Sequence, residues 1–125
     1  MSARVLIADD QPEIRELIAR ILVCERYEID SVGNGRTAIE RLQTESYDAV
    51  LLDFMMPLPT GFEVVDWVEQ NRPNMAKSCV IIITAAVRDL QKFDASRVYA
   101  VLEKPFDLVQ LVDTVKACIE SKKHD

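Results

Sequence analysis

The sequence predicts an α/β fold in which five parallel strands form a doubly wound open sheet in the order 2-1-3-4-5. Short apolar runs, as expected for strands buried on both faces, alternate along the chain with segments whose apolar residues recur every three or four positions. Strands that alternate with helices pair in parallel through right-handed crossovers. The second run alternates apolar and polar residues, which is typical of a strand with one wet face, so the predicted order places it at an edge.

The five strands are predicted at the apolar runs. They cover residues 4–8, 27–32, 48–53, 79–83 and 98–102. The third run ends on Asp53 and passes at once into a loop that carries Pro57, so this strand presents a carboxylate at the rim of the sheet. Taken alone, Asp53 is explained equally well as the start of a turn, because aspartates often follow strands. Other parts of the chain decide between these interpretations.

Five helices are predicted between and after the strands. They begin at about Pro12, Arg36, Gly61, Val87 and Asp107. The third ends at Arg72-Pro73, because the residue before a proline disfavours helical backbone, and the fourth is short and polar (87–94). Apolar stripes give the first and last helices their buried faces, which we expect to include Leu17 and Leu108.

The composition fits one domain over residues 1–125, with a polar tail from about residue 121. A net charge of -6 argues against direct nucleic-acid binding, since neutralising phosphates needs an excess of lysine and arginine. The apolar runs are far too short to span a bilayer, so no membrane insertion is expected. The first residues show no signal-peptide pattern, which favours a cytoplasmic location.

The cysteines and the single histidine exclude several kinds of site. Cys24, Cys79 and Cys118 lack the spacing of metal ligands, and we expect them to be reduced and largely buried thiols. His124 lies in the polar tail. Zinc sites and serine or cysteine triads need a positioned histidine, so neither is expected.

Polar side chains follow four of the predicted strands at the point where each strand ends. They are Asp9, Asp10, Asp53, Thr84 and Lys104. The carboxyl ends of parallel strands share one rim, and a ligand crevice opens where the winding reverses, between the first and third strands. Five unrelated turn residues would require five coincidences, so we interpret these residues as one site.

Three carboxylates in one crevice repel each other. Two unit charges about 5 Å apart cost roughly 3 kcal/mol at an effective dielectric constant of about 20. Lys104 supplies one positive charge, so a hard divalent cation with oxygen ligands, Mg²⁺, is the natural complement. A carboxylate can also act as a nucleophile that forms an aspartyl-phosphate, and phosphoryl transfer needs little beyond positioning and charge neutralisation.

This ordered set of motifs resembles that of response-regulator receiver domains of two-component signalling, including the chemotaxis receiver, over essentially the whole chain. The motifs are Asp9-Asp10, Asp53 with Met56-Pro57 and Gly61, Thr84-Ala85, and Lys104-Pro105-Phe106. The resemblance implies a flavodoxin-like (βα)5 fold. It also implies a signalling domain that is not an enzyme and only assists its own phosphoryl transfer and dephosphorylation.

By this resemblance, Asp53 accepts a phosphoryl group from the phosphohistidine of a sensor histidine kinase or a histidine phosphotransfer protein. Asp10, Asp53 and the backbone carbonyl of Met55 would bind Mg²⁺, or Mn²⁺, and Asp9 would act through water. Phosphorylation would then change the face that binds an unknown downstream effector. The domain would be a monomer or a phosphorylation-dependent dimer.

The same resemblance assigns switch residues around the phosphoryl group. Lys104 would pair with one phosphoryl oxygen. Thr84, followed by Ala85, would turn its hydroxyl toward another. The lysine–proline peptide is commonly cis in the family, so Pro105 is a candidate cis-proline.

The chain departs from the family pattern before the last strand. The stretch 85–103, of 19 residues, is shorter than usual, which predicts a short or poorly ordered fourth helix and an atypical output face. The aromatic switch position is Val101, and Tyr99, expected on the same face of the strand, is the candidate substitute. Met55 and Ala86 flank the crevice and cannot orient an attacking water, which predicts slow self-hydrolysis.

Three other functions compete with a phosphorylation-controlled switch. A degenerate receiver could dock a partner without being phosphorylated, although all five rim residues are intact. A flavodoxin-like electron carrier would need a phosphate-cradling loop after the first strand, where Asp9 and Asp10 would repel a flavin phosphate. A phosphatase would need a second aspartate two residues after Asp53. A phosphorylation-controlled switch therefore accounts for more of the polar residues at the strand ends than the other functions do.

Overall fold

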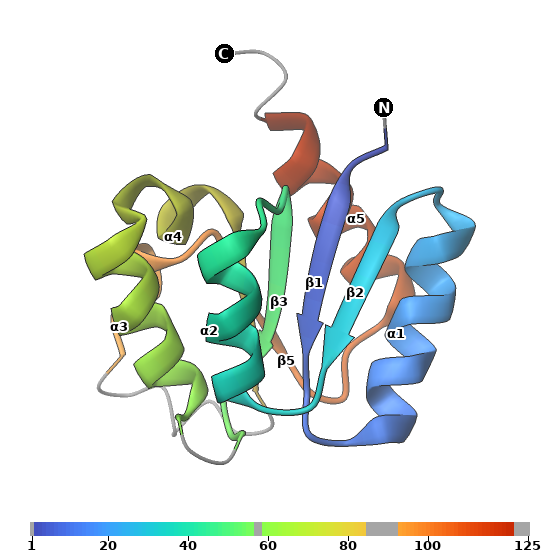
Figure 1. Ribbon diagram of the computed structural model, residues 1–125. Coiled ribbons are helices and arrows are strands. Elements are labelled where there is room, and N and C mark those ends of the chain that lie inside the picture. The colour runs from blue at the N-terminus through green and yellow to red at the C-terminus, as the bar shows by residue number, and fades with distance from the viewer. Residues whose placement is uncertain (1, 57–58, 85–92, 122–125) are drawn as a thin grey trace.

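Five parallel strands form one sheet in the order β2-β1-β3-β4-β5, which confirms the predicted topology. The computed structural model describes residues 2–56, 59–84 and 93–121 (Figure 1). The strands are β1 (Arg4–Ala8), β2 (Glu28–Val32), β3 (Ala49–Asp53), β4 (Val80–Thr84) and β5 (Ala100–Glu103). In this register Ala8 lies opposite Leu52 and Asp53 opposite Ile83, so the carboxyl ends of the strands share one rim.

Helices cover both faces of the sheet (Figure 1). Their bounds are α1 (Pro12–Cys24), α2 (Gly35–Thr44), α3 (Gly61–Asn71), α4 (Pro73–Cys79) and α5 (Leu108–Ser121), with a short 3-10 helix, η2 (Ala95–Arg97), before β5. One face is covered by α1 and α5, and the other by α2, α3 and α4. Within the described part of the chain, no helix has the length and apolar character needed to span a bilayer.

The segment between α3 and β4 differs from the prediction. The sequence predicts an end of helix at Arg72-Pro73, and α3 does end at Asn71, but Pro73 then begins a further helix, α4. Proline fits the first position of a helix because the N–H that it lacks has no intrahelical partner there. The predicted fourth helix (87–94) falls largely outside the described residues. Phe93 and Asp94 are described and lead into η2.

The core consists of two apolar layers, one on each face of the sheet. Every residue of β3 is buried, as expected for a central strand covered on both sides. The apolar stripes of α1 and α5 are narrower than predicted, because Leu17 is 46% exposed and Leu108 is 40% exposed. Both side chains instead contribute to a surface groove described below.

The cysteines do not share one environment. Cys79 and Cys118 are buried, as predicted. Cys24 is exposed, so the expectation of a buried thiol is wrong for this position. It is the last residue of α1, and its position two residues after the buried Leu22 places it on the opposite face of the helix.

Three phenylalanines from separate segments form an aromatic cluster. Phe54 directly follows β3, Phe62 lies in the first turn of α3, and Phe93 precedes η2. The ring centroids of Phe54 and Phe93 are 5.4 Å apart, and those of Phe62 and Phe93 are 5.6 Å apart, both in edge-to-face geometry. This geometry suits the ring quadrupoles and adds to the burial of the rings.

Arg97 covers this cluster and connects it to α3. Its guanidinium carbon lies 5.1 Å from the ring centroid of Phe93 and 5.2 Å from that of Phe62. The same guanidinium donates hydrogen bonds to Asp66 and Glu69, both on α3. The hydrogen bond from Arg97 holds the pKa of Glu69 below its usual value. The chain just before β5 is therefore fixed to α3.

We expect Phe93→Ala to lower the free energy of unfolding by about 3 kcal/mol, because it removes a buried ring that contacts two others. Urea denaturation followed by the fluorescence of Trp67, the only tryptophan, measures the change. Val109→Ala, at a residue that is 66% exposed, serves as the control and should change the stability by no more than about 0.5 kcal/mol. Equal effects of the two substitutions would contradict a structural role for the cluster.

Candidate functional site

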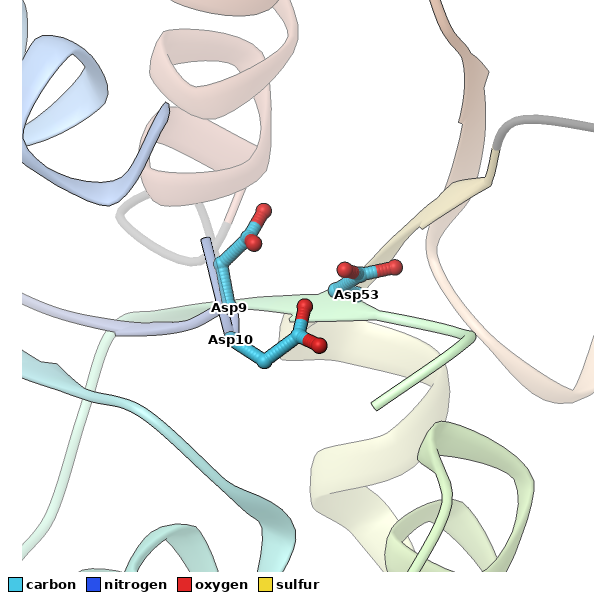
Figure 2. Close-up of side chains that lie close together, drawn as sticks. All are labelled: Asp9, Asp10 and Asp53. Carbon is cyan, nitrogen blue, oxygen red and sulfur yellow. The ribbon is translucent and has the colours of Figure 1, made fainter. Parts of the chain in front are cut away.

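The ends of β1, β3 and β5 bring three carboxylates and one ammonium group together. Asp9 and Asp10 follow β1, Asp53 ends β3, and Lys104 follows β5. One carboxylate oxygen from each of the three aspartates lies within 4.8 Å of the other two. Figure 2 shows the side chains of Asp9, Asp10 and Asp53 together at the ends of β1 and β3. The site thus lies at the point where the winding of the sheet reverses.

Asp53 is held rigidly by its neighbours in the chain. It is 4% exposed, and its Oδ1 accepts a hydrogen bond of 3.1 Å from the N–H of Met55. The next residue, Phe54, donates its N–H to the carbonyl of Ile83 on β4. The backbone after β3 is therefore bound to the adjacent strand, which fixes the direction of the Asp53 side chain.

Gly61 allows α3 to begin close to this turn. A Cβ atom at this position would lie 2.7 Å from both the carbonyl oxygen of Asp53 and the Cα of Phe54, closer than real Cβ contacts come. The N–H of Gly61 also donates to the carbonyl of Phe54. A glycine is thus required here by the close approach of the backbone.

Asp9 and Asp10 occupy different environments. Asp9 is 1% exposed, its Oδ1 accepts a hydrogen bond of 2.9 Å from the N–H of Gln11, and its Oδ2 has no hydrogen-bond partner among the described residues. Asp10 is exposed at the mouth of the site. The Nζ of Lys104 lies 3.6 Å from Asp9 Oδ2 and 3.5 Å from Asp53 Oδ2. One lysine thus faces two buried carboxylates.

The electrostatics of the site disfavour an isolated carboxylate at position 53. Burial raises the pKa of Asp53 above its usual value, and the charges of Asp9 and Asp10 act in the same direction. The N–H of Met55 and the charge of Lys104 oppose the rise in pKa without cancelling it. The cluster therefore has less positive charge than its carboxylates require.

The whole pattern matches a known family. Residues 5–116 match the family model of the response regulator receiver domain. The chain belongs to this family. Among curated relatives, the receiver protein CpdR of Brucella abortus is 34% identical over 113 residues, which cover 90% of this chain and 93% of that protein.

The longer relatives show that receiver domains also occur within larger proteins. The transcriptional regulatory protein TcrA of Mycobacterium tuberculosis is 34% identical over 116 residues, 91% of this chain but 45% of that protein. The receiver spans about half the length of several such regulators.

Solved structures confirm the flavodoxin-like receiver fold. The response regulator TrrA of Thermotoga maritima, solved in complex with Mg²⁺ and BeF, has a TM-score of 0.82, 32% identity and coverage of 94% of this chain and 99% of that one. A receiver domain of Methanospirillum hungatei has a TM-score of 0.88 and 21% identity, covering 99% of this chain and 98% of that chain, and it supports the fold alone.

The residues of the receiver's acidic cluster fit a divalent cation. Mg²⁺ prefers carboxylate and carbonyl oxygens and commonly retains several waters. The cluster offers three carboxylates, of which Asp9 has an oxygen without a hydrogen bond among the described residues. A bound Mg²⁺ would supply the positive charge that Lys104 alone does not.

The structure describes only some of the remaining predicted site residues. Met55 lies two residues beyond Asp53 with an exposed side chain, and the role of its carbonyl oxygen stays a prediction. Thr84 ends β4, one residue past the strand partner of Asp53, while its side chain and Ala85 lie outside what the structure describes, as does Ala86. The Lys104–Pro105 peptide bond is cis.

Val101 and Tyr99 do not share a face, so that expectation is wrong. Val101 packs against the layer formed by α2, α3 and α4, whereas Tyr99 packs against the layer of α1 and α5. The reason is that β5 begins at Ala100, so the alternation of a strand does not extend back to Tyr99. Tyr99 stays fixed by its N–H, which donates to the carbonyl of Val80.

Two residues that contact the site were not identified from the sequence. Arg15 of α1 donates a hydrogen bond of 2.7 Å to the carbonyl of Asp9, and Phe54 joins the turn after Asp53 to the aromatic cluster. A hydrogen bond to a backbone carbonyl leaves no pattern in a sequence. The position of Phe54, immediately after the predicted strand end, is a usable signal.

We expect Asp53→Asn to raise the free energy of unfolding at pH 7 in the absence of divalent cations. A raised pKa means that the folded state holds more protons than the unfolded state between the two pKa values, so stability falls as pH rises through that window. The substitution removes this cost and keeps an oxygen that can accept from Met55. Urea denaturation at several pH values measures the difference.

The gain should disappear below about pH 3.8, the ordinary pKa of an aspartate, because both states are then protonated. Asp113→Asn, at an exposed carboxylate on α5, is the control and should change the stability little at any pH. A lower stability of Asp53→Asn at pH 7 would contradict the electrostatic argument.

Proposed function

We propose that this receiver domain is a phosphoacceptor switch. It takes a phosphoryl group from a histidine kinase or a histidine phosphotransfer protein onto Asp53, in a reaction that depends on Mg²⁺ or Mn²⁺. The observation that supports this most directly is a buried, immobilised carboxylate with two further carboxylates within 4.8 Å and a lysine 3.5 Å away. Such an arrangement provides a nucleophile, a cation site and a fixed positive charge in one place.

The transfer follows from these positions. A carboxylate oxygen of Asp53 attacks the phosphorus of phosphohistidine in line with the phosphorus–nitrogen bond. That bond breaks, and its electron pair stays on the imidazole nitrogen. Lys104, which already lies 3.5 Å from Asp53 Oδ2, would pair with an oxygen of the transferred group. When bound, Mg²⁺ supplies charge neutralisation for the phosphoryl oxygens.

A bound cation would also affect the ionisation of Asp53, because the pKa of this carboxyl is raised. The ionised carboxylate is the nucleophile, and burial disfavours this form. A cation beside Asp9 and Asp10 would favour ionisation, as Lys104 does in part. Transfer is therefore coupled to cation binding through the charge of the acceptor itself.

An apolar groove beside Lys104 supports a protein as the phosphodonor. Its lining residues come from α1 and from the connection between β5 and α5, and they are Ile14, Leu17, Lys104, Pro105, Phe106 and Leu108. A donor protein that brings a phosphohistidine to Asp53 must cover this region, since Lys104 belongs to both the groove and the site. The exposed side chains of Leu17 and Leu108 would then be buried against the donor.

We place the domain in the cytoplasm, where the kinase or phosphotransfer protein and a downstream effector would meet it. Direct nucleic-acid binding is not part of the proposal, because the net charge of -6 opposes it. Phosphorylation changes the charge of a site that is continuous with the aromatic cluster and β5. The effector would therefore recognise a change in the surface beside the aromatic cluster and β5.

Incubation with acetyl phosphate and Mg²⁺ should add one phosphoryl group to the chain, detected by intact-protein mass spectrometry. Asp53→Asn should remain unlabelled, and chelation of the cation should slow labelling by on the order of a hundredfold, because the charge on the transferred oxygens is then not neutralised. Asp113→Asn, which leaves the site intact, should be labelled as the wild type is. Failure to label the wild-type chain would favour a receiver that acts as a phosphorylation-independent docking module.

Leu17→Ala should slow phosphotransfer from a protein donor by about tenfold while leaving labelling by acetyl phosphate unchanged, since only the protein donor contacts the groove. A panel of purified, radiolabelled histidine kinases and phosphotransfer proteins measures the first rate. Val23→Ala, at an exposed residue of the same helix outside the groove, is the matched control. Equal transfer to both variants would exclude this groove as the donor surface.

A further inference from the structure

Arg15 lies beside the acidic cluster without being one of its members. It is a half-buried residue in the first turns of α1, and its Nη1 donates a hydrogen bond of 2.7 Å to the backbone carbonyl of Asp9. An arginine beside a carboxylate can pair with it directly through two parallel hydrogen bonds. This one binds the backbone, so its effect on the site passes through the orientation of a peptide group.

The other polar groups of Asp9 are also held. Its N–H donates to the carbonyl of Val32 at 3.1 Å, and its Oδ1 accepts from Gln11. With Arg15 on the carbonyl, only Oδ2 lacks a hydrogen bond within the described residues, and that atom faces Lys104. Asp9 is therefore fixed by Val32 of β2, by Gln11 just before α1 and by Arg15 within α1.

The carbonyl that Arg15 holds also orients Asp10. The peptide group between Asp9 and Asp10 is planar, so fixing the carbonyl fixes the N–Cα bond of Asp10. The Asp10 carboxylate extends from this backbone into the cluster (Figure 2). Because Asp10 is exposed, few other contacts constrain it. Arg15 thus helps to fix the backbone from which the Asp10 side chain extends.

The absence of a side chain at Gly33 leaves room for the guanidinium of Arg15. A Cβ atom on Gly33 would lie 3.1 Å from Arg15 Nη1 and 3.8 Å from its Cζ, so the arginine rests against the chain just after β2. Gly33 directly follows Val32, the residue that accepts the N–H of Asp9. Since no described glycine has a positive φ, the backbone at Gly33 would accept an alanine without strain, and the methyl group would press on Arg15.

We propose that Arg15 is a positioning residue of the divalent-cation site, which sets the geometry of Asp9 and Asp10 through the Asp9 carbonyl. This rests on the proposed function, because it assigns a role toward the cation of the same site. Removing a group that orients the metal ligands without binding the metal itself typically lowers the metal affinity tenfold to a hundredfold, so a measurable effect is expected.

Isothermal titration of the full chain with MgCl₂ tests the proposal. Arg15→Met, which keeps the length of the side chain and removes its donors, should weaken Mg²⁺ binding by about tenfold or more. Arg15→Lys, which restores one donor, should recover part of the affinity. Arg20→Met, at an exposed arginine of the same helix, should bind Mg²⁺ as the wild type does. Thermal unfolding without Mg²⁺ verifies that each variant is folded.

Gly33→Ala provides a second, independent perturbation of the same contact. It should weaken Mg²⁺ binding although Arg15, Asp9 and Asp10 are all present, and it should have no further effect in the Arg15→Met background. If Arg15→Met does not fold, Gly33→Ala and Arg15→Lys carry the test. Wild-type affinity in Arg15→Met, or in both of the other variants, overturns the positioning role alone. Absence of Mg²⁺ binding by the wild-type chain overturns it together with the proposed function.

Discussion

The burial of the Asp53 carboxylate next to two others is the constraint from which the rest of the site follows. A charged group with 4% exposure at the end of a fully buried strand costs free energy unless positive charge lies close to it. Lys104 supplies part of that charge, and Asp9 and Asp10 add to the demand. The carboxylates of such a site repel one another, and a cation bound among them would relieve that repulsion.

The sheet topology makes this arrangement possible at low cost. Because β1 and β3 are neighbours whose following helices cover opposite faces, the connections that leave their carboxyl ends go to opposite sides and leave room for polar groups at the rim. The same rim needs close backbone approach on two sides. Gly61 admits the start of α3 beneath Asp53, and Gly33 admits the guanidinium of Arg15 beside Asp9. Two glycines thus shape the crevice that the aspartates fill.

Patterns that repeat along the chain were predictable, and contacts that depend on one local geometry were not. The apolar run before Asp53 and the polar edge of β2 determine the strand order, and the structure has that order. By contrast, α4 was missed because Pro73 ends one helix and begins the next. Helical periodicity also predicts that Leu17 is buried, whereas the buried face of α1 is narrower and leaves Leu17 exposed. Periodicity gives no indication of the role of Arg15, because the partner of Arg15 is a backbone carbonyl.

The aromatic cluster connects the backbone next to Asp53 to segments outside the site. Phe54 is bonded directly to Asp53, and its ring contacts that of Phe93 at 5.4 Å, while Arg97 covers Phe93 and binds acids of α3. Close-packed rings do not absorb displacements of a backbone, so a shift of the turn after β3 must be shared by these segments. Val101 packs on this same layer. The turn that follows Asp53 is therefore packed directly into the layer formed by α2, α3 and α4.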